Sequence, residues 1–82
     1  MRIDKFLNSV NITKRRSVAQ DMLNSKVVLL NGKIAKQSKD VAVGDRIELI
    51  YFEAKKQYKV LELPTTKSTP KSQQSRYIQE LI

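Results

Sequence analysis

The dipeptide Asn31-Gly32 constrains the fold of this chain more than any other feature. It directly follows Val27-Val28-Leu29-Leu30, a run that is too short and too rich in β-branched residues for a helix. Asn-Gly after such a run predicts a β-hairpin with a type I′ turn, because both central residues of that turn need positive φ. We therefore expect antiparallel strands from about residue 27 onward.

Two helices are predicted ahead of this hairpin from the spacing of apolar residues. The first, from residue 3 to about residue 10, has one apolar face with side chains at i, i+3, i+4 and i+7: Ile3, Phe6, Leu7 and Val10. Thr13 is the predicted N-cap of the second helix, which covers about residues 14–24. Its apolar stripe consists of Val18, Ala19, Met22 and Leu23. Each helix therefore has a face to bury.

Alternating apolar residues predict further strands after the hairpin. Gly44 belongs to a second predicted turn, and residues 46–52 then alternate, with one side formed by Ile47, Leu49 and Tyr51. Residues 55–63 alternate as well. Four aromatic residues are expected in the core rather than on the surface: Phe6, Tyr51, Phe52 and Tyr58. The predicted fold class is α+β, with the two N-terminal helices packed on a small twisted antiparallel sheet.

The C-terminal part of the chain differs in composition. Residues 64–75 contain Pro, Thr, Lys, Ser and Gln and no apolar side chain, which is typical of a flexible linker. Apolar residues then recur at helical spacing: Tyr77, Ile78, Leu81 and Ile82. This motif forms either a short C-terminal helix that docks on the domain or a segment that orders only on a partner. We expect a domain over residues 1–63 and a polar linker with a short apolar motif over residues 64–82.

The positive charge of the chain is concentrated in its first half. The formal net charge is +8, and residues 1–39 contribute +7 of it, with nine Lys and Arg against two acids. Three of these cations, Lys14-Arg15-Arg16, fall in the predicted first turn of the second helix. Each costs about 0.3–1 kcal/mol there, because a helix N-terminus already carries partial positive charge. Replacing Arg16 should therefore not lower stability, whereas phosphate bound at this helix end would turn the cost into binding energy.

Several classes of chemistry are excluded by the residue types that are absent. The chain has neither Cys nor His, which removes disulfides, thiolate zinc sites, cysteine nucleophiles and imidazole catalysis. The acids occur singly, and the two glycines form no phosphate-binding loop. We expect no enzymatic activity, metal or cofactor. No long apolar run follows Met1, so we expect neither a signal peptide nor a membrane span, and a cytoplasmic protein.

Four motifs occur in the order of a known RNA-binding domain. They are Arg2-Ile3-Asp4-Lys5-Phe6-Leu7, Lys14-Arg15-Arg16-Ser17-Val18-Ala19, Val28-Leu29-Leu30-Asn31-Gly32-Lys33 and Val43-Gly44-Asp45-Arg46-Ile47. Together they resemble the S-four RNA-binding domain, named after small-subunit ribosomal protein four. A short chain of this kind with a brief C-terminal extension is most similar to the family of ribosome-associated heat-shock protein 15. Members of that family bind a dissociated large ribosomal subunit that still carries nascent chain on tRNA.

The resemblance implies a helix–helix–hairpin unit that presents a basic face to structured RNA. Carried onto this sequence, the RNA-binding positions are Arg2, Lys5, Lys14, Arg15, Arg16, Lys33 and Lys36. Asp4 is expected to orient a neighbouring Arg, while Asn31, Gly32 and Gly44 are turn residues. One position departs from the family pattern: Lys26 stands where the family usually has Gly, and a left-handed helix end there would be strained.

The predicted function is that of a non-enzymatic protein that contacts structured ribosomal RNA or tRNA on the large ribosomal subunit. The expected role is the rescue or quality control of stalled translation, by a monomer. Three alternatives remain open: a factor that acts on a ribosomal precursor, an RNA-binding module of a base-modifying enzyme, and an adaptor to a protein or membrane surface. Cations at a helix start, rather than along an amphipathic helix, argue against a membrane partner.

Overall fold

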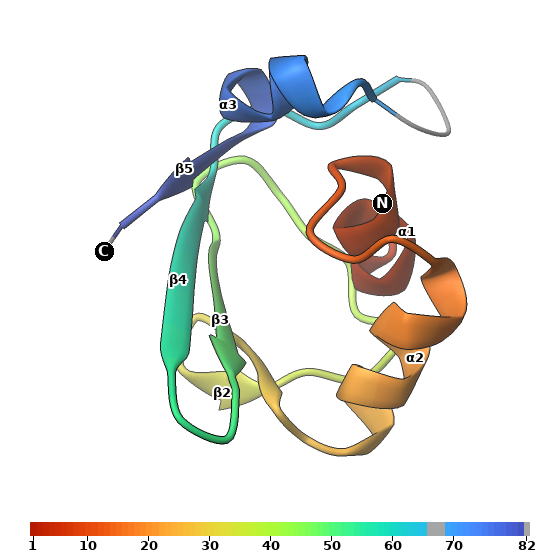
Figure 1. Ribbon diagram of the computed structural model, residues 1–82, viewed down its shortest axis with the longest axis vertical. Helices are drawn as coiled ribbons and strands as arrows, with labels where there is room; N and C mark the ends of the chain where they lie inside the picture. Colours follow the sequence, from red (N-terminus) through yellow and green to blue (C-terminus); the bar gives the residue numbers. More distant parts are fainter. Residues whose placement is uncertain (66–68, 82) are drawn as a thin grey trace.

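The structure, a computed structural model, describes residues 1–65 and 69–81 (Figure 1). Helices α1 (Ile3–Ser9) and α2 (Arg16–Asn24) come first. The strands are β1 (Val28–Leu30), β2 (Lys33–Ile34), β3 (Arg46–Ile50), β4 (Lys55–Val60) and β5 (Ile78–Glu80). A 3-10 turn, η1 (Lys71–Gln73), and the one-turn helix α3 (Gln74–Tyr77) precede β5. Both N-terminal helices thus lie close to their predicted bounds.

The strands of the described residues form one antiparallel sheet in the order β2-β1-β3-β4-β5. Strand β1 pairs with β2 across the Asn31-Gly32 turn, where φ is 53° at Asn31 and 83° at Gly32. Positive φ at both residues is what a type I′ turn requires. Strand β3 pairs with β1 on one side and β4 on the other, so it lies at the centre of the sheet. The predicted α+β fold class is confirmed.

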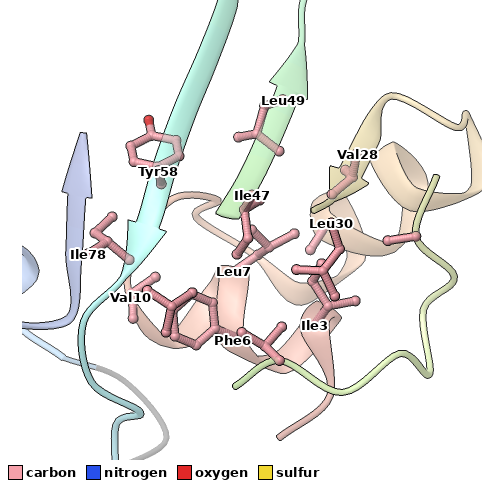
Figure 2. Packing of buried hydrophobic residues seen from close by; sticks show 14 of the residues in the cluster. Ile3, Phe6, Leu7, Val10, Val28, Leu30, Ile47, Leu49, Tyr58 and Ile78 are labelled. Carbon is pink, nitrogen blue, oxygen red and sulfur yellow. The ribbon is translucent and has the colours of Figure 1, made fainter. Parts of the chain in front are cut away.

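One hydrophobic core connects the helices to the sheet (Figure 2). The predicted apolar face of α1 is fully buried in it: Ile3, Phe6, Leu7 and Val10. The sheet contributes side chains from its central strands: Val28, Leu30, Ile47, Leu49, Tyr58 and Val60. Helix α2 contributes Ala19 and Leu23, whereas Val18, at the edge of its predicted stripe, is 43% exposed. Burial of this kind is worth about 1.5–3 kcal/mol for each large side chain, so α1 is held firmly against the sheet.

Two aromatic residues that we expected in the core lie on the surface. Phe6 and Tyr58 are buried, but Tyr51 is 40% exposed and Phe52 is fully exposed. The reason is the end of β3 at Ile50, after which the alternation that would turn Tyr51 inward stops. The Tyr51 amide instead donates to the Ala54 carbonyl oxygen at 2.7 Å and closes the turn between β3 and β4.

The C-terminal apolar motif docks on the domain that precedes it. Tyr77 and Ile78 are buried in the core cluster, and the Leu81 amide donates to the Gln57 carbonyl oxygen at 2.9 Å. The predicted helix is only one turn long, because Ile78 is extended (φ −136°, ψ 149°) and starts β5 along the edge of β4. Ile82 and part of the predicted linker lie outside the described residues. The division of the chain after residue 63 stays a prediction.

Candidate nucleic-acid interface

A buried carboxylate at the start of α1 gathers two arginine side chains. Asp4 is fully buried, and its Oδ2 accepts hydrogen bonds from Arg2 Nη2 at 3.2 Å and Arg16 Nη2 at 3.3 Å. Gln20 Nε2 donates to the same oxygen at 3.2 Å, and the Lys5 amide donates to Oδ1 at 2.8 Å. Arg2 lies just before α1 and Arg16 begins α2, so Asp4 fixes the two helix starts relative to each other.

The surroundings of Asp4 keep it ionised. Burial by itself raises the pKa of a carboxyl group, but the hydrogen bonds from Gln20 and the Lys5 amide oppose this, as do the charges of Arg16 and Arg2. The net result is a pKa of Asp4 below its usual value. At neutral pH the carboxylate therefore remains a charged acceptor for both guanidinium groups.

Each guanidinium group keeps a solvent-facing side. The side chain of Arg2 is 48% exposed and that of Arg16 is 46% exposed, although both contact Asp4. A guanidinium group has five N–H donors, so an arginine held by one carboxylate oxygen retains donors for a phosphate. Two arginines and the exposed Lys5 against one acid leave a net positive charge here. Asp4 holds the neighbouring Arg2, as the sequence predicted, and also Arg16, which the sequence did not predict.

The cation run lies at the start of α2, but not in the predicted register. Helix α2 begins at Arg16, with Arg15 as N-cap residue, so Lys14 and Arg15 precede the first turn. The prediction that Thr13 caps the helix is wrong. The Thr13 hydroxyl instead donates to the Arg15 carbonyl oxygen at 3.2 Å. This bond lies within the turn between the two helices. The N-cap residue Arg15 makes no side-chain capping bond, and Lys14 and Arg15 are exposed beside this end of α2.

The segment after β2 brings further lysines toward the arginine pair. The Ile3 amide donates to the Lys39 carbonyl oxygen and the Val41 amide to that of Met1, both at 2.8 Å, so this segment runs beside Arg2. A depression of about 690 Å³ opens along it, and the lysines that line it are Lys33, Lys36 and Lys39. The two predicted positions, Lys33 and Lys36, thus share one surface. The backbone hydrogen bond between Lys39 and Ile3 places this surface next to Arg2.

Two residues of this surface, Lys39 and Gln20, escaped the sequence prediction. Lys39 was not singled out, because only the pairing with Ile3 brings it to the start of α1. Gln20 could have been predicted from the sequence, because it follows Arg16 by four residues and therefore lies on the same helical face. Lys26 lines a second depression, of about 430 Å³, together with Lys36.

Lys26 occupies the left-handed conformation that its position in the chain suggested. Its φ is 61°, its amide donates to the Leu23 carbonyl oxygen, and the next amide, of Val27, donates to Met22. These two bonds form the Schellman motif that ends many helices, in which Gly is the usual residue at this point. Helix α2 therefore ends with the backbone geometry that Gly usually adopts, at the cost of strain in Lys26.

In the parts of the chain that the structure describes, no helix has the length and apolarity to cross a membrane. Nor do Asp and Glu side chains gather there into a group that could hold a metal ion.

Comparison with known proteins places this surface in a family context. The S4 domain model matches residues 1–47, which include α1, α2 and the first hairpin. An RQC P-site tRNA stabilizing factor from Helicobacter pylori is 49% identical over 78 residues, covering 95% of this chain and 93% of that protein. Another, from Streptococcus pneumoniae, is 34% identical over 82 residues, covering 100% of this chain and 90% of that protein. Among solved structures, a trimeric structure of Vibrio cholerae Heat Shock Protein 15 matches this chain with a TM-score of 0.88 at 28% identity. The match covers 98% of this chain and 80% of that one.

Proposed function

This chain belongs to the S4 domain family and, within it, to the RQC P-site tRNA stabilizing factors, and from this membership we infer its function. It is a non-enzymatic RNA-binding protein that binds tRNA on the stalled large ribosomal subunit during ribosome-associated quality control. We expect it in the cytoplasm, where ribosomes translate, and as a monomer.

The observation that supports this function best is the arginine pair on Asp4. Two half-exposed guanidinium groups from the starts of two helices share one buried carboxylate oxygen, so their positions are set before RNA arrives. Pre-set donors lose less conformational entropy on binding than free side chains do. We propose that Arg2 and Arg16 form the centre of the RNA contact, with Lys5, Lys14 and Arg15 around them and Lys33 and Lys36 at its margin.

The surface suits folded RNA better than unpaired bases. Its exposed predicted side chains are cations, which contact phosphates, and no aromatic residue lies among them. Proteins that bind unpaired bases commonly stack them on aromatic side chains, whereas duplex RNA is recognised by shape and backbone. The exposed aromatic residues of the described chain, Tyr51 and Phe52, lie in the turn after β3.

The first test is binding to an in vitro transcribed tRNA and to isolated large subunits at several salt concentrations. If about five to six phosphates are neutralised, log K against log salt should have a slope of about −3.5 to −5. A slope near zero would contradict a backbone-dominated contact. Sedimentation of a cell lysate on a sucrose gradient separates the alternatives: we expect the protein with free large subunits, and a position with immature particles would favour an assembly role.

A further inference from the structure

We propose that residues 69–74 form a strap that positions the RNA-binding cations of the turn between α1 and α2, with Thr69 and Gln74 as its positioning residues. This inference rests on the proposed function. In Figure 1 the C-terminal segment, coloured blue, passes over the end of α1, coloured red. No local pattern predicts a contact between residues 69–74 and the end of α1, because Ser9 and Thr69 lie sixty residues apart.

Helix α1 ends in a turn with a left-handed residue, and the C-terminal segment donates hydrogen bonds to this turn. The last carbonyl groups of a helix have no partner within it. Asn11, with φ of 63°, donates its amide to the Asn8 carbonyl oxygen, and the Ile12 amide donates to that of Leu7. This is a Schellman motif with Asn in the left-handed position. These two bonds use the carbonyl groups of Asn8 and Leu7.

The strap donates hydrogen bonds to the next two carbonyl groups, those of Ser9 and Val10. The Thr69 amide and hydroxyl both donate to the Ser9 carbonyl oxygen, at 2.9 and 2.8 Å. Gln74 Nε2 donates to the Val10 carbonyl oxygen at 2.8 Å, and Asn11 Nδ2 donates in return to the Thr69 carbonyl oxygen. Thr69 is only 3% exposed, so its bonds are shielded from competing water. Three successive residues of the turn are thereby tied to the C-terminal segment.

A second set of bonds carries this constraint to the cations. Asn8 Nδ2 donates to the Lys14 carbonyl oxygen at 3.3 Å and to that of Thr13 at 3.5 Å. The Thr13 amide donates to the Leu7 carbonyl oxygen at 3.1 Å, and its hydroxyl holds Arg15. The backbone of Lys14 and Arg15 is therefore fixed to the last turn of α1, whose end the strap holds.

Loss of the strap should loosen the turn without opening the core. Asp4 holds Arg16 independently of residues 69–74, and the apolar face of α1 stays buried. Lys14 and Arg15 would then sample more conformations and lose the pre-set geometry on which tight binding depends. The expected signature is weaker RNA binding with fewer phosphates engaged, which a purely structural role would not produce.

The test uses the full chain and a transcribed tRNA, with affinity measured by fluorescence anisotropy at several salt concentrations. Thr69→Val keeps the shape of the side chain and removes its hydroxyl, and Gln74→Ala removes the bond to Val10. We expect the double variant to bind about tenfold more weakly. Its slope of log K against log salt should become less negative by about one to two units, because each phosphate contact contributes close to one unit. The single variant Thr69→Ser, with Gln74 unchanged, keeps the hydroxyl and should show the wild-type affinity and slope.

Ile78→Val is the matched control, because it weakens the packing of β5 without touching the turn. At a temperature where all variants are folded, it should bind RNA as the wild type does. An unchanged affinity or an unchanged slope in the double variant, or an equal loss in Ile78→Val, would overturn the strap. Should the double variant not fold, Gln74→Ala alone decides by the same two readouts. If the wild type itself shows no salt-dependent RNA binding, the proposed function fails instead.

Discussion

At the scale of single residues, Asp4 serves the fold and the proposed function together. A buried carboxylate is stable only when it is paired and hydrogen-bonded, and Asp4 has four different donor residues. Two of them, Arg2 and Arg16, are also the residues that we place at the centre of the RNA contact. Their positive charges therefore stabilise the folded chain through Asp4, in addition to being repelled by the partial positive charge of the helix N-termini.

Arg16→Ala should consequently lower stability as well as RNA affinity. From the sequence we expected no loss of stability, since the change removes a cation from a helix N-terminus. The pairing with buried Asp4 reverses this sign, and we expect the free energy of unfolding to fall by about 0.5–1.5 kcal/mol, at the low end for a charged hydrogen bond because the group is half exposed. Binding to RNA should weaken by about 1–3 kcal/mol.

Lys14→Ala is the matched control for that variant, since Lys14 is exposed and precedes α2. It should weaken RNA binding and leave the urea midpoint unchanged. An Arg16→Ala protein that unfolds at the wild-type urea midpoint would show that Asp4 gains nothing from this arginine.

Stability should depend on pH through Asp4. Its folded pKa lies below the value of about 3.9 expected in the unfolded chain, so the unfolded state binds the proton more readily. The contribution of Asp4 is therefore fully present above about pH 4 and is lost as the pH falls through its folded pKa. Urea unfolding between pH 6 and 2.5 should show a smaller decline for Asp4→Asn than for the wild type. Parallel curves would mean that other carboxyl groups cause the acid sensitivity.

At the scale of secondary-structure elements, both N-terminal helices end in the same way. Asn11 follows α1 and Lys26 follows α2, each with positive φ and with the two hydrogen bonds of a Schellman motif. Asn tolerates the left-handed conformation better than Lys does. The end of α2 is therefore the more strained of the two.

Lys26→Gly should stabilise the protein. Relief of the left-handed strain is worth about 1–2 kcal/mol, and the greater freedom of Gly in the unfolded chain offsets about half of it. We expect a net gain of about 0.5–1 kcal/mol in urea unfolding. Lys26→Ala removes the same charge but keeps the strain, so it should show no such gain. A gain of equal size in both variants would assign the effect to charge. Tenfold weaker RNA binding in both would make Lys26 a phosphate contact.

At the scale of the whole molecule, the C-terminal segment belongs to the same packed unit as the helices. Strand β5 extends the sheet, Tyr77 and Ile78 enter the core, and residues 69–74 close the end of α1. The chain thus returns at its end to the turn that carries its most basic sequence.

Truncation after residue 63 tests the predicted division of the chain. The loss of Tyr77 and Ile78 from the core should cost about 1.5–3 kcal/mol for each side chain, a large part of the stability of a domain this small. We expect the shortened chain to have a much lower urea midpoint than the full chain. Equal midpoints for the two would show that residues 1–63 fold as an independent domain.

Much of the fold was predictable because the signals are local. The apolar spacing of α1, the Asn31-Gly32 turn and the alternation in β3 each depend on residues within one or two turns of chain, and all three appear in the structure. Predictions failed where a local pattern ends without a local marker. Tyr51 and Phe52 continued the apolar run but lie past the last paired residue of β3.

The amino-acid sequence by itself determined the two helices, the first hairpin, the basic half of the chain and the family to which it belongs. Only the tertiary structure decided what the cations do beyond repelling one another. The pairing of Asp4 with Arg16 spans twelve residues, that of Ser9 with Thr69 spans sixty, and β5 exists because the edge of β4 was free to receive it. Such contacts depend on how the core brings distant segments together, so they cannot be predicted from the spacing of residues along the chain.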